Sequence, residues 1–319
     1  MKSTIIIPNY NGAAYLENCL RSIEGEQADI IVIDNGSTDN SCYIIREYFP
    51  QVRLVCFKKN RGFCAAVNKG IRLAKTKFVI LLNNDTEAET GFVTALEQAM
   101  EADGKLFAAS AKLISMHDKR LTDDAGDLYC ALGWAYAIGK GKPEINYNVP
   151  RRIFAACGGA AIYRRDILLR LGLFDENHFA YLEDIDIGYR AAIYGYHSAF
   201  VPSARVYHAG SASSGSRYNT FKVKLAAANS IYLIYKNMPF LQIVINLPFL
   251  FAGFFIKTLF FIRKGFGKEY VQGLMKGFRM CMTREGRSHK VHFIWSRIAN
   301  YCGIQLALWV NMIKRITMR

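Results

Sequence analysis

The chain has 319 residues, of which 51% are hydrophobic, and it carries a formal net charge of +15. This length and composition predict one large globular domain, or a domain with an appendage, and the chain has no low-complexity tracts or repeats. The eight cysteines include no Cys-x-x-Cys pair, which argues against a zinc-binding spacing and predicts buried thiols in a reducing compartment.

The positive charge is concentrated at the C-terminal end. Thirteen Lys and Arg residues but only two acids lie between Lys257 and the end of the chain, which contributes +11 to the net charge. Such an asymmetry predicts a tail that meets the phosphates of a membrane or a nucleic acid. At the other end, Pro8 stops the apolar run 5–7, which is too short for a signal peptide, so we expect a cytoplasmic catalytic part.

The first hundred residues alternate β-branched runs with amphipathic helical stretches. Buried parallel strands are predicted at 5–7, 30–33, 52–55 and 78–82, with helices near 13–24, 39–48, 63–74 and 89–102. This alternation predicts a doubly wound, Rossmann-like α/β unit.

The rest of the chain changes character twice. Residues 105–215 mix short strands, near 107–113, 153–156, 199–201 and 205–208, with a helix that begins near Glu183. From about 217 onward the sequence is helical, apolar and basic. We therefore predict an α/β catalytic domain at 1–220 and a helical, membrane-associating region at 221–319.

Polar residues follow each of the four predicted strands, where an open α/β sheet binds its ligands. The four segments are Pro8-Asn9-Tyr10-Asn11-Gly12, Asp34-Asn35-Gly36-Ser37-Thr38-Asp39, Asn60-Arg61-Gly62 and Asn83-Asn84-Asp85. We expect all four to converge on one rim.

These residue types suit a nucleoside diphosphate that is held without a phosphate-binding glycine loop. Tyr10 can flank a base, and Asp34 can accept from a base imide or a ribose hydroxyl. Asp85 can ligate a hard divalent ion that also binds the diphosphate oxygens. Ordinary Asx turns and helix caps explain each segment singly, but the four together favour nucleotide binding.

Three carboxylates, Glu183, Asp184 and Asp186, lie within four positions at the predicted helix start. Two acids would satisfy a helix N-terminus by capping and by the dipole, and three exceed that need. At helical spacing Asp184 projects away from the face shared by the other two, so it can act as the base that deprotonates an acceptor hydroxyl.

His208 ends a predicted strand and precedes a small-residue turn. A lone strand histidine is more often structural, but here a neutral imidazole could complete the metal shell or bind the leaving diphosphate.

Taken together, these segments resemble glycosyltransferase family 2, and most closely its rhamnosyltransferase-like branch of polysaccharide biosynthesis enzymes. The motifs that carry the resemblance are Ile7 to Gly12, Val32 to Asp39, Asn60 to Phe63, Leu82 to Asp85, Phe174 to Glu176, Glu183 to Asp186, and His208. They cover roughly residues 3–235.

The resemblance implies a GT-A fold, a nucleotide-sugar donor and a Mg²⁺ or Mn²⁺ ion at the family's Asp-x-Asp position. Asn83 stands where the first Asp of that motif would be, so Asp85 is its carboxylate. The resemblance also implies displacement with inversion, with Asp184 as the general base. Residues 158–160, Gly-Gly-Ala, resemble the family's acceptor-side turn, although a plain tight turn explains them equally well.

The sequence lacks the motifs of two other enzyme classes, processive synthases and dinucleotide-binding dehydrogenases. The tryptophans lack the Gln-x-x-Arg-Trp pattern of a processive synthase, which favours single-sugar transfer, and only Gly12 of a dinucleotide-binding glycine pattern is present. A polyprenyl-phosphate glycosyltransferase remains an alternative. The basic tail is also strongly apolar, which fits a membrane better than a nucleic acid. The sugar, the base (thymidine, uridine or guanosine), the acceptor and the oligomeric state stay open.

Residues 238–262 are apolar enough to span a bilayer. Polar residues interrupt the run and basic residues flank both ends, so a single span would place the basic tail outside, against the positive-inside tendency. We therefore expect a re-entrant or in-plane arrangement at the cytoplasmic face of the membrane, with a helix packed on the catalytic domain as the alternative.

Overall fold

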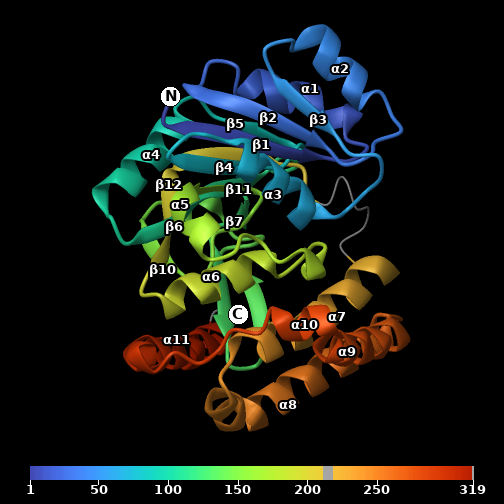
Figure 1. The fold of residues 1–319 in the computed structure, drawn as a ribbon, viewed down its shortest axis with the longest axis vertical. Coiled ribbons are helices and arrows are strands. Elements are labelled where there is room, and N and C mark those ends of the chain that lie inside the picture. The colour runs from blue at the N-terminus through green and yellow to red at the C-terminus, as the bar shows by residue number, and fades with distance from the viewer. Residues whose placement is uncertain (211–217, 318–319) are drawn as a thin grey trace.

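The computed structural model describes residues 1–210 and 218–317 (Figure 1). Its first hundred residues alternate strands and helices, as predicted. The elements are β1 (Ser3–Asn9), α1 (Ala13–Ser22), β2 (Ala28–Asp34), α2 (Ser41–Tyr48), β3 (Arg53–Cys56), α3 (Phe63–Leu73), β4 (Phe78–Leu82), β5 (Thr86–Ala88) and α4 (Phe92–Ala102). Four of the strands pair in parallel, in the spatial order β4-β1-β2-β3.

The middle of the chain widens this sheet and adds a small hairpin. Its elements are β6 (Leu106–Ser115), β7 (Thr122–Asp124), β8 (Asp127–Cys130), β9 (Trp134–Ala137), η1 (Glu144–Asn146), β10 (Arg151–Ile153), β11 (Ala160–Arg164), α5 (Arg165–Arg170), η2 (Glu176–His178), α6 (Glu183–Ile193) and β12 (His197–His208). The sheet order becomes β10-β12-β6-β11-β4-β1-β2-β3, with β11 antiparallel to both of its neighbours. The strands predicted at 199–201 and 205–208 are one strand, β12, with an irregularity between Val201 and Arg205.

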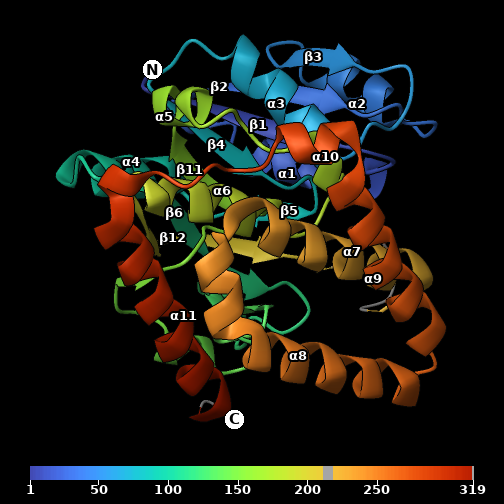
Figure 2. The same cartoon turned by 60° about the horizontal axis from the view of Figure 1, so that its bottom comes forward.

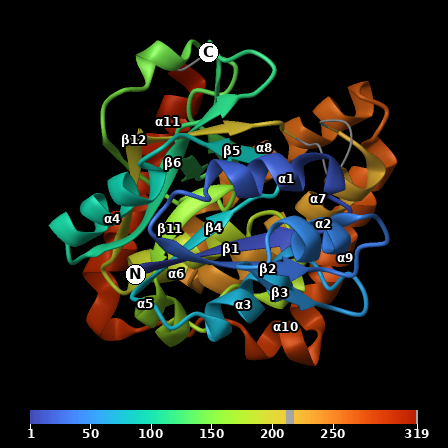
Figure 3. The ribbon, with the colours of Figure 1, turned by 90° about the horizontal axis from the view of Figure 1, so that it is seen from above.

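The central strands are apolar throughout because helices cover both faces of the sheet. Ile5 and Ile7 of β1 pack in one core cluster with residues of α1, α2 and α4, whereas Ile6 packs in a second cluster with residues of α3 and α6. Figure 3 shows α1 and α3 on opposite sides of β1 and β4. One strand prediction needs correction: β3 is half-exposed rather than buried, because it forms the edge of the sheet.

The C-terminal part is helical, as predicted. It consists of α7 (Thr220–Asn237), α8 (Phe240–Arg263), α9 (Gly267–Met282), α10 (Arg284–Ser288), η4 (Trp295–Arg297) and α11 (Ile298–Thr317). α9 packs along α7, and α11 packs against α6 and β8. Figures 1 and 2 place α8, α9 and α11 at the end of the molecule opposite β1–β3. The predicted α/β class, with a helical C-terminal region, is therefore confirmed, while the boundary at 220 stays a prediction.

Candidate active site

The segments that follow β1, β2 and β4 meet at the carboxyl edge of the parallel strands. Asn9 Nδ2 donates to Asp34 Oδ1 at 2.9 Å, and Asn84 Nδ2 donates to Asn9 Oδ1 at 2.7 Å. Gly12 closes over this pair, since a Cβ there would lie 1.9 Å from Asn84 Nδ2. A side chain at this position would force the rim apart.

The segment after β3 joins the same rim through Asn35. The Asn35 side chain donates to Asn60 Oδ1 at 3.1 Å and to the Gly62 carbonyl at 3.0 Å, and its Oδ1 accepts from Arg61 N at 2.8 Å. The predicted convergence of the four segments is therefore confirmed. Their contact with a nucleotide stays a prediction.

Exposure separates residues that build the rim from residues that can reach a ligand. Asn9 is 1% exposed and Asn84 is 5% exposed, so both serve the internal framework. Tyr10 is 40% exposed and free to stack on a base. Arg61 is about half exposed, with its guanidinium 3.5 Å from Glu176.

The remaining predicted rim residues take part through the backbone. Pro8 is half-buried within β1, and Asn83 N donates to the Gly159 carbonyl at 2.9 Å. That bond ties the Gly-Gly-Ala turn to the end of β4, and Ala160 already belongs to β11.

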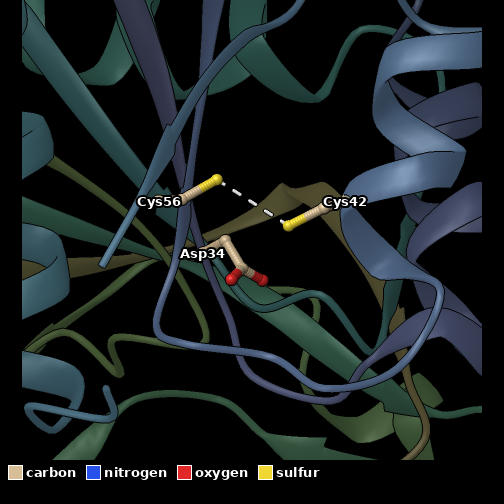
Figure 4. A group of neighbouring side chains, drawn as sticks. All are labelled: Asp34, Cys42 and Cys56. Atoms are coloured by element: carbon tan, nitrogen blue, oxygen red, sulfur yellow. Dashed lines mark hydrogen bonds between the residues drawn. The ribbon is translucent and has the colours of Figure 1, made fainter. Parts of the chain in front are cut away.

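Asp34 lies beside two thiols, those of Cys42 and Cys56, whose sulfur atoms are 3.7 Å apart (Figure 4). The ligand atoms of all three residues lie within 4.8 Å of one another. The prediction of buried thiols is wrong here, because Cys56 ends the edge strand β3 and Cys42 lies in the first turn of the half-exposed helix α2. Cys302 is exposed as well.

The predicted metal ligands Asp85 and His208 lie together. β12 pairs with β5, which brings His208 Nε2 to 3.4 Å from Asp85 Oδ1. The other ring nitrogen, Nδ1, lies 2.8 Å from Asp123 Oδ2, and Asp123 also pairs with Lys140 at 2.7 Å. This is a carboxylate–histidine arrangement in which Nδ1–H is held by an acid and Nε2 faces a second carboxylate.

The charges around His208 favour its cationic form in the protein alone. Burial opposes protonation, but Asp123 and Asp85 outweigh it and raise the pKa of His208 to about 9. Burial likewise opposes ionisation of Asp123, but His208 and Lys140 hold its pKa well below its usual value. A metal ion at Nε2 would replace the proton there.

Asp184 lies in the first turn of α6 and faces a second group of acids. Asp127 is hydrogen-bonded to the Asp184 side chain, and the ligand atoms of Asp124, Asp127 and Cys157 lie within 4.8 Å of one another. The Asp184 carboxylate also accepts from the backbone N–H of Ile185 at 2.7 Å.

Burial raises the pKa values throughout this group. It raises the pKa of Asp184, and a hydrogen bond from Asp127 works in the opposite direction. Burial and the neighbouring acids raise the pKa of Asp127 well above its usual value and that of Asp124 to about 7. The carboxyl groups of Asp184 and Asp127 therefore both have pKa values above the usual range.

The other two acids of the helix start are buried and do not cap the helix. The N-cap residue of α6, Leu182, makes no side-chain cap bond. Asp186 accepts from Arg190 at 2.6 Å and from Lys236 at 2.9 Å, so it neutralises buried cations. Burial and Asp184 raise the pKa of Glu183 to about 8, and its Oε2 has no partner among the described residues.

Sequence reasoning missed the turn from β7 to β8, which contributes Asp123, Asp124 and Asp127. The signal was present, because Asp-Asp-Ala-Gly-Asp places three acids within five positions. Gly126, at φ +100°, makes the turn tight, and its N–H donates to Asp124 Oδ1. One short turn thus joins the group around His208 to the group around Asp184.

Known proteins share this sequence and fold. The sequence model of "Glycosyl transferase family 2" matches residues 4–172. An N-acetylglucosaminyl-diphospho-decaprenol L-rhamnosyltransferase of Mycobacterium tuberculosis is 26% identical over 239 residues, covering 66% of this chain and 77% of that protein.

Two solved structures share the fold over nearly the whole chain. Residues 1–349 of S. aureus TarS in complex with UDP-GlcNAc superpose with a TM-score of 0.59 at 15% identity, covering 97% of this chain and 90% of that one. The mannosyltransferase PcManGT of Pyrobaculum calidifontis, in complex with GDP-Man and Mn²⁺, gives 0.53 at 17% identity, covering 96% and 87%. Because the matched family model spans more than half of the 319 residues, this chain belongs to glycosyl transferase family 2 and is a glycosyltransferase that uses a nucleotide-sugar donor.

Proposed function

We propose that the enzyme is an inverting, metal-dependent transferase that moves a single sugar from a nucleotide donor to a hydroxyl of a lipid-linked glycan in cell-surface polysaccharide synthesis. The observation that carries the proposal is the β7–β8 turn. Asp123 of that turn reaches His208, which lies beside Asp85, and Asp127 reaches Asp184. A candidate donor site and a candidate base are thereby held side by side.

In this mechanism Asp184 accepts the proton of the acceptor hydroxyl, and the hydroxyl oxygen bonds to the anomeric carbon. The bond from that carbon to the diphosphate oxygen breaks on the opposite face, which inverts the configuration. A carboxylate whose pKa is raised by burial is a better base near neutral pH than an exposed one. Such a base contributes ~10²–10⁴-fold to the rate.

The residues present fit a divalent ion. Asp85 is 4% exposed and offers a carboxylate. The Asp123 carboxylate fixes the His208 ring through Nδ1, so that Nε2 faces Asp85. When bound, the ion would neutralise the diphosphate and so stabilise the leaving group. Two solved relatives of this fold contain Mn²⁺, which supports the assignment.

The relatives support the proposed donor and acceptor. The mycobacterial relative is named for rhamnosyl transfer to a diphospho-decaprenol sugar, which supports a dTDP-rhamnose-like donor and a lipid-linked acceptor. TarS was solved with UDP-GlcNAc, which keeps a UDP-sugar as the second candidate donor. A polyprenyl phosphate is the alternative acceptor.

Substitution of Asp184 by Asn tests the base. We expect Asp184→Asn to lose at least ~10²-fold in kcat while nucleotide affinity is retained, because a base acts on the acceptor. A variant that keeps more than about a tenth of wild-type kcat would exclude Asp184 as the base.

Two further substitutions test the donor side by calorimetry. Asp85→Ala should weaken nucleotide binding only when Mn²⁺ is present, since an ion held by Asp85 would neutralise the charge of the diphosphate. Asp34→Ala should weaken it with or without Mn²⁺. Equal nucleotide affinity of Asp85→Ala and wild type in Mn²⁺ would contradict the metal assignment.

The membrane proposal rests on α8, whose polar side faces the protein. Its buried positions are Gln242, Asn246, Leu250 and Gly253, on one face of the helix. Gln242 accepts a hydrogen bond from Tyr189, and Asn246 bonds with Gln305 of α11 at 2.8 Å. The outward face is apolar; Phe240, Leu241 and Phe251 are 82%, 68% and 75% exposed. An apolar face of this size on a 24-residue helix supports the proposed membrane contact.

Contacts along the whole of α8 favour an in-plane orientation over a span. Its first turns contact α6 through Gln242, Trp134 Nε1 donates to the Gly253 carbonyl at 3.1 Å, and Phe260 and Phe261 pack on Tyr218. These contacts at both ends of the helix support the in-plane orientation, because a span would break them. Arg263 and Lys264, at its end, would then meet anionic headgroups at ~1 kcal/mol each.

Impermeant thiol labelling of intact cells tests this placement. We expect no labelling of cysteines introduced in segment 263–290, and binding to anionic vesicles that weakens with salt. Labelling from outside would contradict the cytoplasmic placement, and purification without detergent as a freely soluble protein would contradict membrane association.

A further inference from the structure

The backbone just before Asp184 is held in a strained conformation. Phe179, Tyr181 and Leu182 have φ values of +60°, +70° and +68°. This region is costly for residues with a Cβ, and such residues persist there only when their surroundings hold them. Three of them within four positions mean that the segment 179–182 does not fold into this shape by local preference.

The group that holds the segment is Asn229 of α7. Its Nδ2 lies 2.9 Å from the carbonyl oxygen of His178 and 2.8 Å from each of those of Ala180 and Tyr181. Asn229 is fully buried, and its Oδ1 has no partner among the described residues. Both N–H groups of the Asn229 amide thus point at this one segment, while its Oδ1 accepts no hydrogen bond from the described residues.

The opposite side of the segment touches the donor rim. The Phe179 carbonyl accepts from Cys64 N at 3.3 Å, and a Cβ on Gly62 would lie 2.6 Å from that same oxygen. The segment is therefore wedged between α7 and the start of α3, with Asp184 at its end.

Buried charges fix α7 itself against the same region. Lys236 Nζ lies 2.8 Å from Asp175 and 2.9 Å from Asp186, and Asn237 Nδ2 donates to Asp186 Oδ1 at 2.8 Å. The acids lie on either side of the strained segment, so α7 spans it as a rigid support.

We propose that Asn229 is a positioning residue for Asp184: its amide holds the strained segment 179–182 and the His178 carbonyl before it, and so sets the place of the base at the start of α6. The inference rests on the proposed role of Asp184. It gives the C-terminal region a part in the chemistry in addition to membrane contact.

The test compares Asn229→Ala and Asn229→Leu, which has nearly the same shape as asparagine but no donor, with wild type. We expect both to lose ~10–100-fold in kcat, the loss expected of a base displaced by about 1 Å. The nucleotide Kd should change by less than about threefold, because donor binding does not depend on the base. Asn246→Ala is the control, since it removes another buried asparagine of the C-terminal region and should keep wild-type kcat.

The double variant Asn229→Ala/Asp184→Asn separates positioning from general destabilisation. If Asn229 acts through Asp184, adding Asn229→Ala to Asp184→Asn should cost no further activity. A further tenfold loss, or wild-type kcat in Asn229→Ala, would overturn the inference while leaving Asp184 as the base. High activity of Asp184→Asn would instead overturn the proposed function. If Asn229→Ala fails to fold, Asn229→Ser takes its place, because it keeps one donor and should give an intermediate kcat. Wild-type kcat in Asn229→Ser would also contradict the positioning role of Asn229.

Discussion

Asp123 is the residue whose role the structure predicts most sharply. It does not face Asp85 directly but holds His208 Nδ1 at 2.8 Å, while Nε2 faces Asp85. Asp123→Asn replaces the carboxylate by an amide of the same shape. The amide is a weaker acceptor, and if its NH₂ turns toward Nδ1 the ring proton is forced onto Nε2, the atom that should bind the ion.

The size of the effect follows from the geometry. Loss of an outer carboxylate on a metal-binding histidine costs ~10–100-fold in metal affinity, which is about 1.4–2.8 kcal/mol. Lys140, at 2.7 Å, already neutralises part of the Asp123 charge. We therefore expect a loss near the lower limit, ~10-fold, for Asp123→Asn.

Calorimetric titration of Mn²⁺ in the presence of the donor nucleotide measures this loss. Lys140→Met is the matched control, because it removes the other partner of Asp123 and keeps the bond to His208. It should bind Mn²⁺ as tightly as wild type or more tightly. Unchanged affinity in Asp123→Asn, or an equal loss in both variants, would refute the assignment of His208 as a ligand.

Three further predictions concern stability and the donor rim. Lys236→Met breaks two buried ion pairs and should lower the free energy of unfolding, measured by urea titration, by ~3–5 kcal/mol. The control is Lys224→Met, on the more exposed side of α7, which should change that free energy by less than ~0.5 kcal/mol. Burial opposes ionisation of Asp175, but Lys236 lowers its pKa to about 2. The stabilisation that ionised Asp175 gives the folded protein is therefore present above about pH 4 and lost as the pH falls toward 2. Over that interval the Tm of Lys236→Met should fall less than the Tm of wild type. The donor nucleotide should slow the alkylation of Cys56 by iodoacetamide but not that of the exposed Cys302, as followed by mass spectrometry. Equal slowing at both cysteines, or slowing at neither, would contradict a donor site beside β3.

The sequence predicted the parallel half of the fold well because that half is encoded locally. Runs such as Ile5-Ile6-Ile7 and 78–82 are apolar at every position, which is typical of strands covered on both faces, and the helices between them carry a regular apolar stripe. The antiparallel strand β11 and the hairpin β8–β9 were not predicted, since they are short and their pairing joins residues far apart in the chain.

The sequence alone determined the family and the order of the strand-end motifs, because these lie in segments whose spacing is characteristic. It also predicted roles for Asp34, Asp85, Asp184 and His208. Only the tertiary structure decided how they are supported. Asp123 and Asn229 carry no local signal for their roles, since each acts through a residue more than forty positions away, His208 in one case and the carbonyls of 178–181 in the other. Packing likewise decided the direction of Gln242 and Asn246 in α8. The sequence shows them only as polar interruptions in an apolar run, whereas in the structure they are buried against the rest of the protein and the apolar face of α8 is exposed.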